Sequence, residues 1–133
     1  MSVRSYYPVL SIPEGKSRRF AIHQFLHEPD HVFHTSNART AFNGQRPGPD
    51  VTYPYATIWH RLTEGGGTWM TDLPIEQHQH YMELRPMYGH VLVGGLGLGL
   101  AATILARKRN VRSFIVVEKS KDVINLVWKH LPY

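Results

Sequence analysis

The segment from residue 89 to residue 118 constrains the fold of this chain more than any other part of it. It reads GHVLVGGLGLGLAATILARKRNVRSFIVVE, in which two apolar runs enclose a glycine-rich turn and a stretch of helix formers. Short continuous apolar runs are typical of parallel strands that are buried on both faces. The order strand, turn, helix, strand therefore predicts a right-handed βαβ unit, with strands at 90–95 and 113–118.

Two helices are expected to pack on these strands. LAATILARKR predicts a helix over 100–109, and Ser120 is expected to cap a second helix over 121–130, whose apolar residues recur at helical spacing. Residues 71–133 are therefore predicted to form a partial Rossmann-like nucleoside-binding unit. This unit would be the first βαβα part of a doubly wound α/β sheet.

The preceding part of the chain has a different character. Residues 1–70 alternate short runs of β-formers with turns rich in Pro and Gly, which predicts a β-rich region without long helices. Trp59 and Trp69 flank a run of three glycines and are expected in the core of a hairpin. Directly after this region, PIEQHQHYMEL predicts a helix over 74–84, with Asp72 as its cap.

The glycine turn has the composition of a ligand-binding loop. Directly after a parallel strand, glycines let a ligand approach the backbone, and the following helix presents free N–H groups there. Glu118 ends the second strand at the same edge, where a carboxylate can accept both hydroxyls of a ribose. Alternatively, the glycines only allow close packing and Glu118 pairs with Lys119 or Lys121. We expect a nucleoside site whose glycines are Gly94, Gly95, Gly97 and Gly99.

The spacing of these residues resembles a known family. Gly95-x-Gly97-x-Gly99 together with Glu118 is similar to motif I of the class I S-adenosylmethionine-dependent methyltransferases. The segments VLVGGLGLG, VVEKSKDVINLV and KHLP, and upstream WMTDLPIEQ, resemble the spermidine synthase-like branch. The resemblance implies that the chain binds S-adenosylmethionine or decarboxylated S-adenosylmethionine. Lys119 stands where the family has an apolar residue that packs on adenine.

The resemblance also implies an activity. A nucleophile would attack the carbon beside the sulfonium, and the protein would mainly position the reactants; no catalytic residue is identified. The segment around Trp69, Asp72 and Glu76 is expected near the ligand cleft. Because the family's domain continues through further strands, the chain is expected to be a truncated form. The alternative is a non-enzymatic module for assembly or partner binding, built from a degenerate methyltransferase fold.

The basic residues suggest no specific partner by themselves. The net charge is +5, and one cluster near the end of the predicted helix holds Arg107, Lys108, Arg109 and Arg112. A helix C-terminus favours cations, and no aromatic residue is interleaved with them in the sequence. We therefore expect a solvent-facing helix end, with nucleic-acid binding as the less favoured alternative.

Composition limits the remaining possibilities. The chain has no cysteine, which excludes disulfides and thiolate metal sites. His23, His27, His31 and His34 are expected to lie on the surface of a hairpin, and no metal site is predicted. The longest apolar window is too short to span a membrane, so a cytoplasmic protein is expected. Two parallel strands with open edges predict a homo-oligomer or a larger protein assembly.

Overall fold

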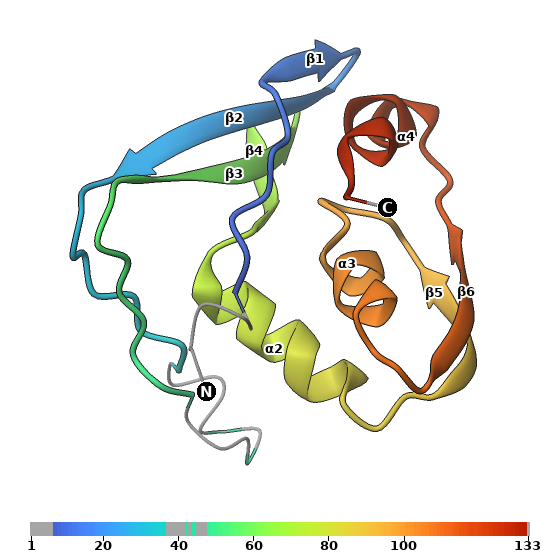
Figure 1. The fold of residues 1–133 in the computed structure, drawn as a ribbon. Coiled ribbons are helices and arrows are strands. Elements are labelled where there is room, and N and C mark those ends of the chain that lie inside the picture. The colour runs from blue at the N-terminus through green and yellow to red at the C-terminus, as the bar shows by residue number, and fades with distance from the viewer. Residues whose placement is uncertain (1–6, 37–41, 43, 45–47, 133) are drawn as a thin grey trace.

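The computed structural model describes residues 7–36, 42, 44 and 48–132, which form a mixed α/β structure (Figure 1). The described residues of the first half make an antiparallel sheet of four strands in chain order. These strands are β1 (Gly15–Ser17), β2 (Phe20–His27), β3 (Thr57–Glu64) and β4 (Gly67–Thr71). The β-rich character expected for this region is therefore confirmed.

The hairpin between β3 and β4 turns at two glycines. Gly65 and Gly66 have φ angles of 56° and 87°, which residues with a side chain rarely adopt. Trp59 is buried, as expected for a hairpin core. Trp69 is 66% exposed, so its predicted place in the core is wrong. Its Nε1 donates a hydrogen bond of 2.7 Å to Glu64 Oε2.

Helices and a parallel strand pair follow in the second half. The elements are α2 (Pro74–Leu84), β5 (Gly89–Gly94), α3 (Leu100–Ala106), β6 (Val111–Val117), α4 (Lys121–Val127) and a 3₁₀ turn, η2 (Trp128–His130). The helix predicted over 74–84 is confirmed, but Asp72 is not its cap. The Asp72 carboxylate instead accepts hydrogen bonds from the backbone N–H and the ring Nδ1 of His60, at 2.6 and 2.7 Å. Leu73 occupies the cap position without a side-chain hydrogen bond.

The predicted βαβ unit forms, with differences at its ends. β5 and β6 pair in parallel, and Leu92 lies opposite Ile115. α3 ends at Ala106, three residues before the predicted end, because the chain turns there to enter β6. Ser120 caps α4 as expected, since its Oγ accepts a hydrogen bond from the Val123 N–H at 3.3 Å.

The prediction that both strands are buried on both faces is wrong. Side chains alternate along each strand, and those on one face are largely exposed: Leu92 by 73%, Ile115 by 65% and Val117 by 58%. The helices lie on the face that is turned toward the antiparallel sheet (Figure 1). No described element packs on the other face, which stays open to solvent.

One of two hydrophobic core clusters among the described residues joins the two halves of the chain. Leu10, Ile12, Ile22 and Leu62 from the first half pack with residues of the glycine turn, α3, α4 and the last turn: Leu96, Leu98, Leu100, Val123, Val127 and Leu131. The Ser17 hydroxyl also donates a hydrogen bond of 2.5 Å to Asp122 Oδ1. The boundary predicted near residue 70 thus separates two kinds of secondary structure that both contribute to this core cluster.

Candidate functional site

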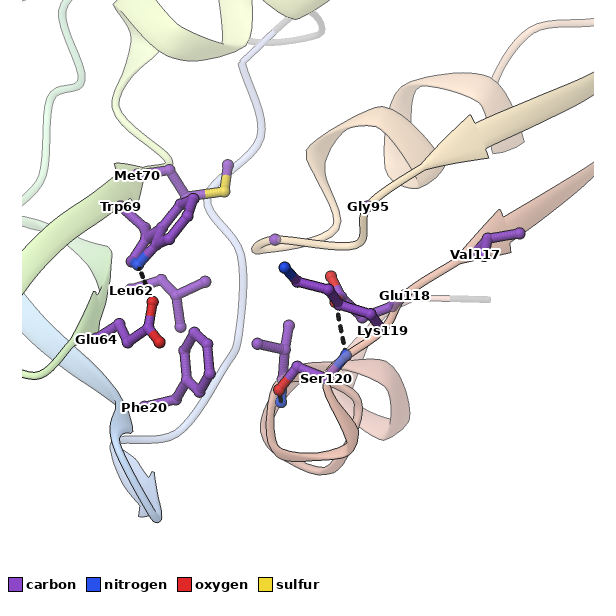
Figure 2. A pocket seen from close by; sticks show the side chains of 12 residues that line it. Phe20, Leu62, Glu64, Trp69, Met70, Gly95, Val117, Glu118, Lys119 and Ser120 are labelled. Atoms are coloured by element: carbon purple, nitrogen blue, oxygen red, sulfur yellow. Dashed lines mark hydrogen bonds between the residues drawn. The ribbon is translucent and has the colours of Figure 1, made fainter.

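A cavity of about 700 Å³ lies between the antiparallel sheet and the carboxyl ends of β5 and β6 (Figure 2). The sheet contributes Phe20, Leu62, Glu64, Trp69 and Met70. The second half of the chain contributes Gly95, Gly97, Val117, Glu118, Lys119, Ser120 and Val123. Four of the six residues predicted for a nucleoside site therefore meet here: Gly95, Gly97, Glu118 and Lys119.

The glycines of the turn have different roles. At Gly95, whose φ is 95°, an added Cβ would point into open space, with no atom within 4 Å. At Gly97 an added Cβ would collide with the Met70 sulfur on the opposite wall. Gly99 does not line the cavity: it is buried, and an added Cβ would lie 2.6 Å from Leu131 Cδ2. Gly94 borders a separate hollow along β5. Close approach of a ligand is therefore supported at Gly95, whereas at Gly97 the space is taken by Met70.

The Glu118 side chain connects the end of β6 to the glycine turn and to the start of α4 through hydrogen bonds. Its Oε1 accepts a hydrogen bond from the Leu96 N–H at 3.0 Å, and its Oε2 accepts one from the Ser120 N–H at 2.9 Å. Burial alone would raise the pKa of this carboxyl. The backbone N–H groups of Leu96, Ser120 and Lys119, together with the Lys119 charge, outweigh burial and leave the pKa lowered. The side chain is therefore an anion at neutral pH.

The two interpretations of Glu118 are compatible in this geometry. Each carboxylate oxygen has a second lone pair, so the backbone contacts leave capacity for further hydrogen bonds. The carboxylate borders the cavity (Figure 2). In the part of the chain that the structure describes, Glu118 forms no ion pair with Lys119 or Lys121. Packing and ligand recognition can thus be served by the same group.

The opposite wall combines aromatic, apolar and acidic side chains. Trp69 lies beside Glu64, and the Met70 sulfur accepts a hydrogen bond of 3.3 Å from the Leu98 N–H (Figure 2). The thioether contact fixes the glycine turn against β4. Phe20 and Leu62 add apolar surface behind them. Such a wall suits a largely apolar ligand with a few polar groups.

The sequence anticipated only part of this wall. Of the segment expected near the cleft, Trp69 lines the cavity, whereas Asp72 and Glu76 do not. Glu76 Oε1 accepts hydrogen bonds from the Thr71 N–H and hydroxyl, at 2.9 and 2.8 Å. Phe20, Leu62, Glu64 and Met70 were not predicted. Strand register could have identified them, because pairing places Phe20 opposite Glu64 and Leu62 opposite Met70.

The histidines lie outside this cavity. The rings of His27 and His31 stack with centroids 4.2 Å apart, and burial together with the nearby His31 lowers the pKa of His27. His34 Nδ1 lies 2.9 Å from Asp50 Oδ1. Among residues 7–36, 42, 44 and 48–132, no group of three or more His, Asp or Glu side chains is arranged to hold a metal ion.

None of the helices described here is both long and apolar enough to cross a membrane.

Comparison with known proteins assigns the chain to no family. No family model, no curated protein and no solved structure matches the chain. Its function therefore has to be inferred from the residues of the site.

Proposed function

We propose that this chain binds S-adenosylmethionine, decarboxylated S-adenosylmethionine or their thioether products in the cavity between its two sheets. In this proposal β5, α3, β6 and α4 are part of a Rossmann-like fold, and the protein is spermidine synthase-like or methyltransferase-like. The observation that carries the proposal is the Glu118 carboxylate, which stands at the carboxyl end of β6 beside the glycine turn and borders the cavity.

The residues fit a nucleoside in three respects. Glu118 is ionised and retains lone pairs that two ribose hydroxyls can reach. The open space at Gly95 lets a ligand approach the backbone, which a side chain would prevent. The volume of about 700 Å³ lies within the usual range for small-molecule sites.

The contribution of the protein to chemistry would be positioning. A bound sulfonium supplies an electrophilic carbon and its own leaving group. Glu118 and the glycine turn would hold the nucleoside end, while Trp69 and Glu64 on the opposite wall face the remaining space. Fixing two reactants in this way is a large source of rate enhancement.

Titration calorimetry with S-adenosylmethionine and its thioether product tests the proposal. We expect binding by the unmutated protein and a loss in Glu118→Ala of about 1.5–3 kcal/mol for each charge-assisted hydrogen bond removed. Glu28→Ala, which removes an exposed carboxylate elsewhere, is the matched control. Thermal unfolding of each variant separates lost binding from lost structure. No heat of binding at millimolar ligand would refute the proposed function.

One observation favours a second candidate, the non-enzymatic assembly module. The exposed apolar face of β5 and β6 is a surface of the kind that partner proteins cover. This candidate predicts self-association without any nucleoside binding, so the same calorimetry distinguishes the two.

A further inference from the structure

Two loops meet at the amino ends of β5 and β6, at the opposite end of these strands from the glycine turn (Figure 1). One loop joins α2 to β5 and the other joins α3 to β6. The Gly89 N–H donates a hydrogen bond of 2.7 Å to the Asn110 carbonyl. Lys108 Nζ donates one of 2.8 Å to the Arg85 carbonyl. The two loops are therefore held side by side.

Positive charge is concentrated in these loops. Residues 85–117 contain five Lys and Arg residues and no Asp or Glu. Four of the five lie in the two loops, and Arg112 lies at the start of β6. Together they form what we call the basic edge: Arg85, Arg107, Lys108, Arg109 and Arg112. Within the described residues, the guanidinium groups of Arg109 and Arg112 have no hydrogen bond or ion pair. Their capacity to bind an anion is unused.

An exposed aromatic side chain shares this surface. A hollow of about 550 Å³ is lined by Tyr88, Gly89, His90, Arg109, Asn110 and Arg112. Tyr88 is 75% exposed. No aromatic residue is interleaved with the basic residues in the sequence, but Tyr88 lines the same hollow from the other loop. Proteins hold single-stranded nucleic acid with two elements, cationic side chains for the phosphates and exposed aromatic rings for the bases, and both are present here.

We propose that the basic edge binds single-stranded nucleic acid, with phosphates on Arg109 and Arg112 and one base stacked on Tyr88. A guanidinium can bind a phosphate through two parallel hydrogen bonds. A strand fits better than a free nucleotide, because the cations extend over both loops rather than surrounding one phosphate. A single strand fits better than a duplex, because stacking on Tyr88 requires an unpaired base.

Fluorescence anisotropy with a labelled oligouridine tests this proposal over a range of salt concentrations. The unmutated protein should bind more weakly as salt rises. Arg109→Gln with Arg112→Gln should lower the slope of log K against log salt by about 1.4, which is about 0.7 for each phosphate contact. Tyr88→Ala should weaken binding about tenfold at each salt concentration and leave that slope unchanged.

A matched control removes the same charge elsewhere. Lys16→Gln with Arg61→Gln neutralises two exposed cations of the antiparallel sheet and should leave binding within about twofold. Circular dichroism shows whether each variant is folded. The proposal is overturned if the control loses as much affinity as the arginine pair, or if Tyr88→Ala binds like the unmutated protein. It is also overturned if uridine monophosphate competes as well as the oligonucleotide does.

Discussion

Glu118 joins β6, the glycine turn and the start of α4 through one carboxylate, and its lowered pKa makes this link depend on pH. Because its pKa is lower in the folded chain than in the unfolded chain, the group adds stability above the usual glutamate pKa of about 4.3. That stability is lost as the pH falls through the lowered value. Acidification from pH 7 to about pH 3 should therefore cost the unmutated protein more unfolding free energy than Glu118→Gln. Urea unfolding at both pH values measures this, and equal losses would contradict it.

Gly99 provides a second prediction at the residue scale. Its φ of 78° and the close approach of Leu131 both oppose a side chain. Gly99→Ala should lower the unfolding free energy by about 2–4 kcal/mol, from left-handed backbone strain and overpacking together. Gly66→Ala shares the left-handed backbone but faces open space, so it should cost only the strain, about 1–2 kcal/mol. Similar losses in denaturant unfolding would show that the Leu131 contact is unimportant.

Local sequence predicted the individual residues of the candidate site only where local geometry decides their position. Gly95, Gly97 and Glu118 follow from a strand, a turn and a strand end, which are all read within one segment. The role of Gly99 depends on Leu131, which lies in a turn after α4 and gives no signal near the glycines. The sheet wall, including Phe20 and Met70, depends on strand pairing across the chain, which periodicity does not reveal.

At the scale of elements, apolar runs identified the two parallel strands but not which of their faces is covered. Leu92 and Val93 are equally apolar in the sequence, yet only the face of Val93 is turned toward the helices. Which face of β5 and β6 is covered depends on where α3 and α4 pack, and that packing cannot be read from the sequence of the strands themselves. The cap of α4, in contrast, is local: Ser120 needs only the backbone N–H of Val123, three residues away. It was therefore predictable.

The Ser120 cap leads to a prediction for the stability of α4. Ser120→Ala removes the acceptor for the Val123 N–H and should lower the unfolding free energy by about 1 kcal/mol. Ser11→Ala, at an exposed position outside the helices, should change it by less than about 0.5 kcal/mol. Thermal or urea unfolding gives both values. A Ser120→Ala protein as stable as the Ser11→Ala protein would show that the cap is not needed.

At the scale of the whole molecule, the open face of the parallel pair should lead to self-association. Leu92, Ile115 and Val117 expose contiguous apolar surface, which is unusual on a monomer. Sedimentation velocity of the unmutated protein should show dimers or larger species that dissociate on dilution. Ile115→Glu should shift the protein toward the monomer, because it places a charge in the middle of that face.

A control of the same chemistry lies on the other sheet. Ile58 is also exposed, on β3, and Ile58→Glu should leave the association unchanged. If the unmutated protein sediments as a monomer at micromolar concentration, the open face is simply tolerated in water. If Ile58→Glu dissociates the protein as fully as Ile115→Glu does, the contact lies on a different surface.

The shared core has a consequence for how the chain is synthesised. Ser17 and Asp122 are 105 residues apart in the sequence but touch in the folded chain. A ribosome adding about 5–20 residues per second needs about 5–20 s to cover that separation. During this interval Leu10, Ile12 and Ile22 have emerged, while their partners in α4 do not yet exist. The apolar face of the antiparallel sheet therefore stays uncovered until α4 has been synthesised. The nascent chain is most vulnerable to aggregation and to capture by chaperones just before α4 is made.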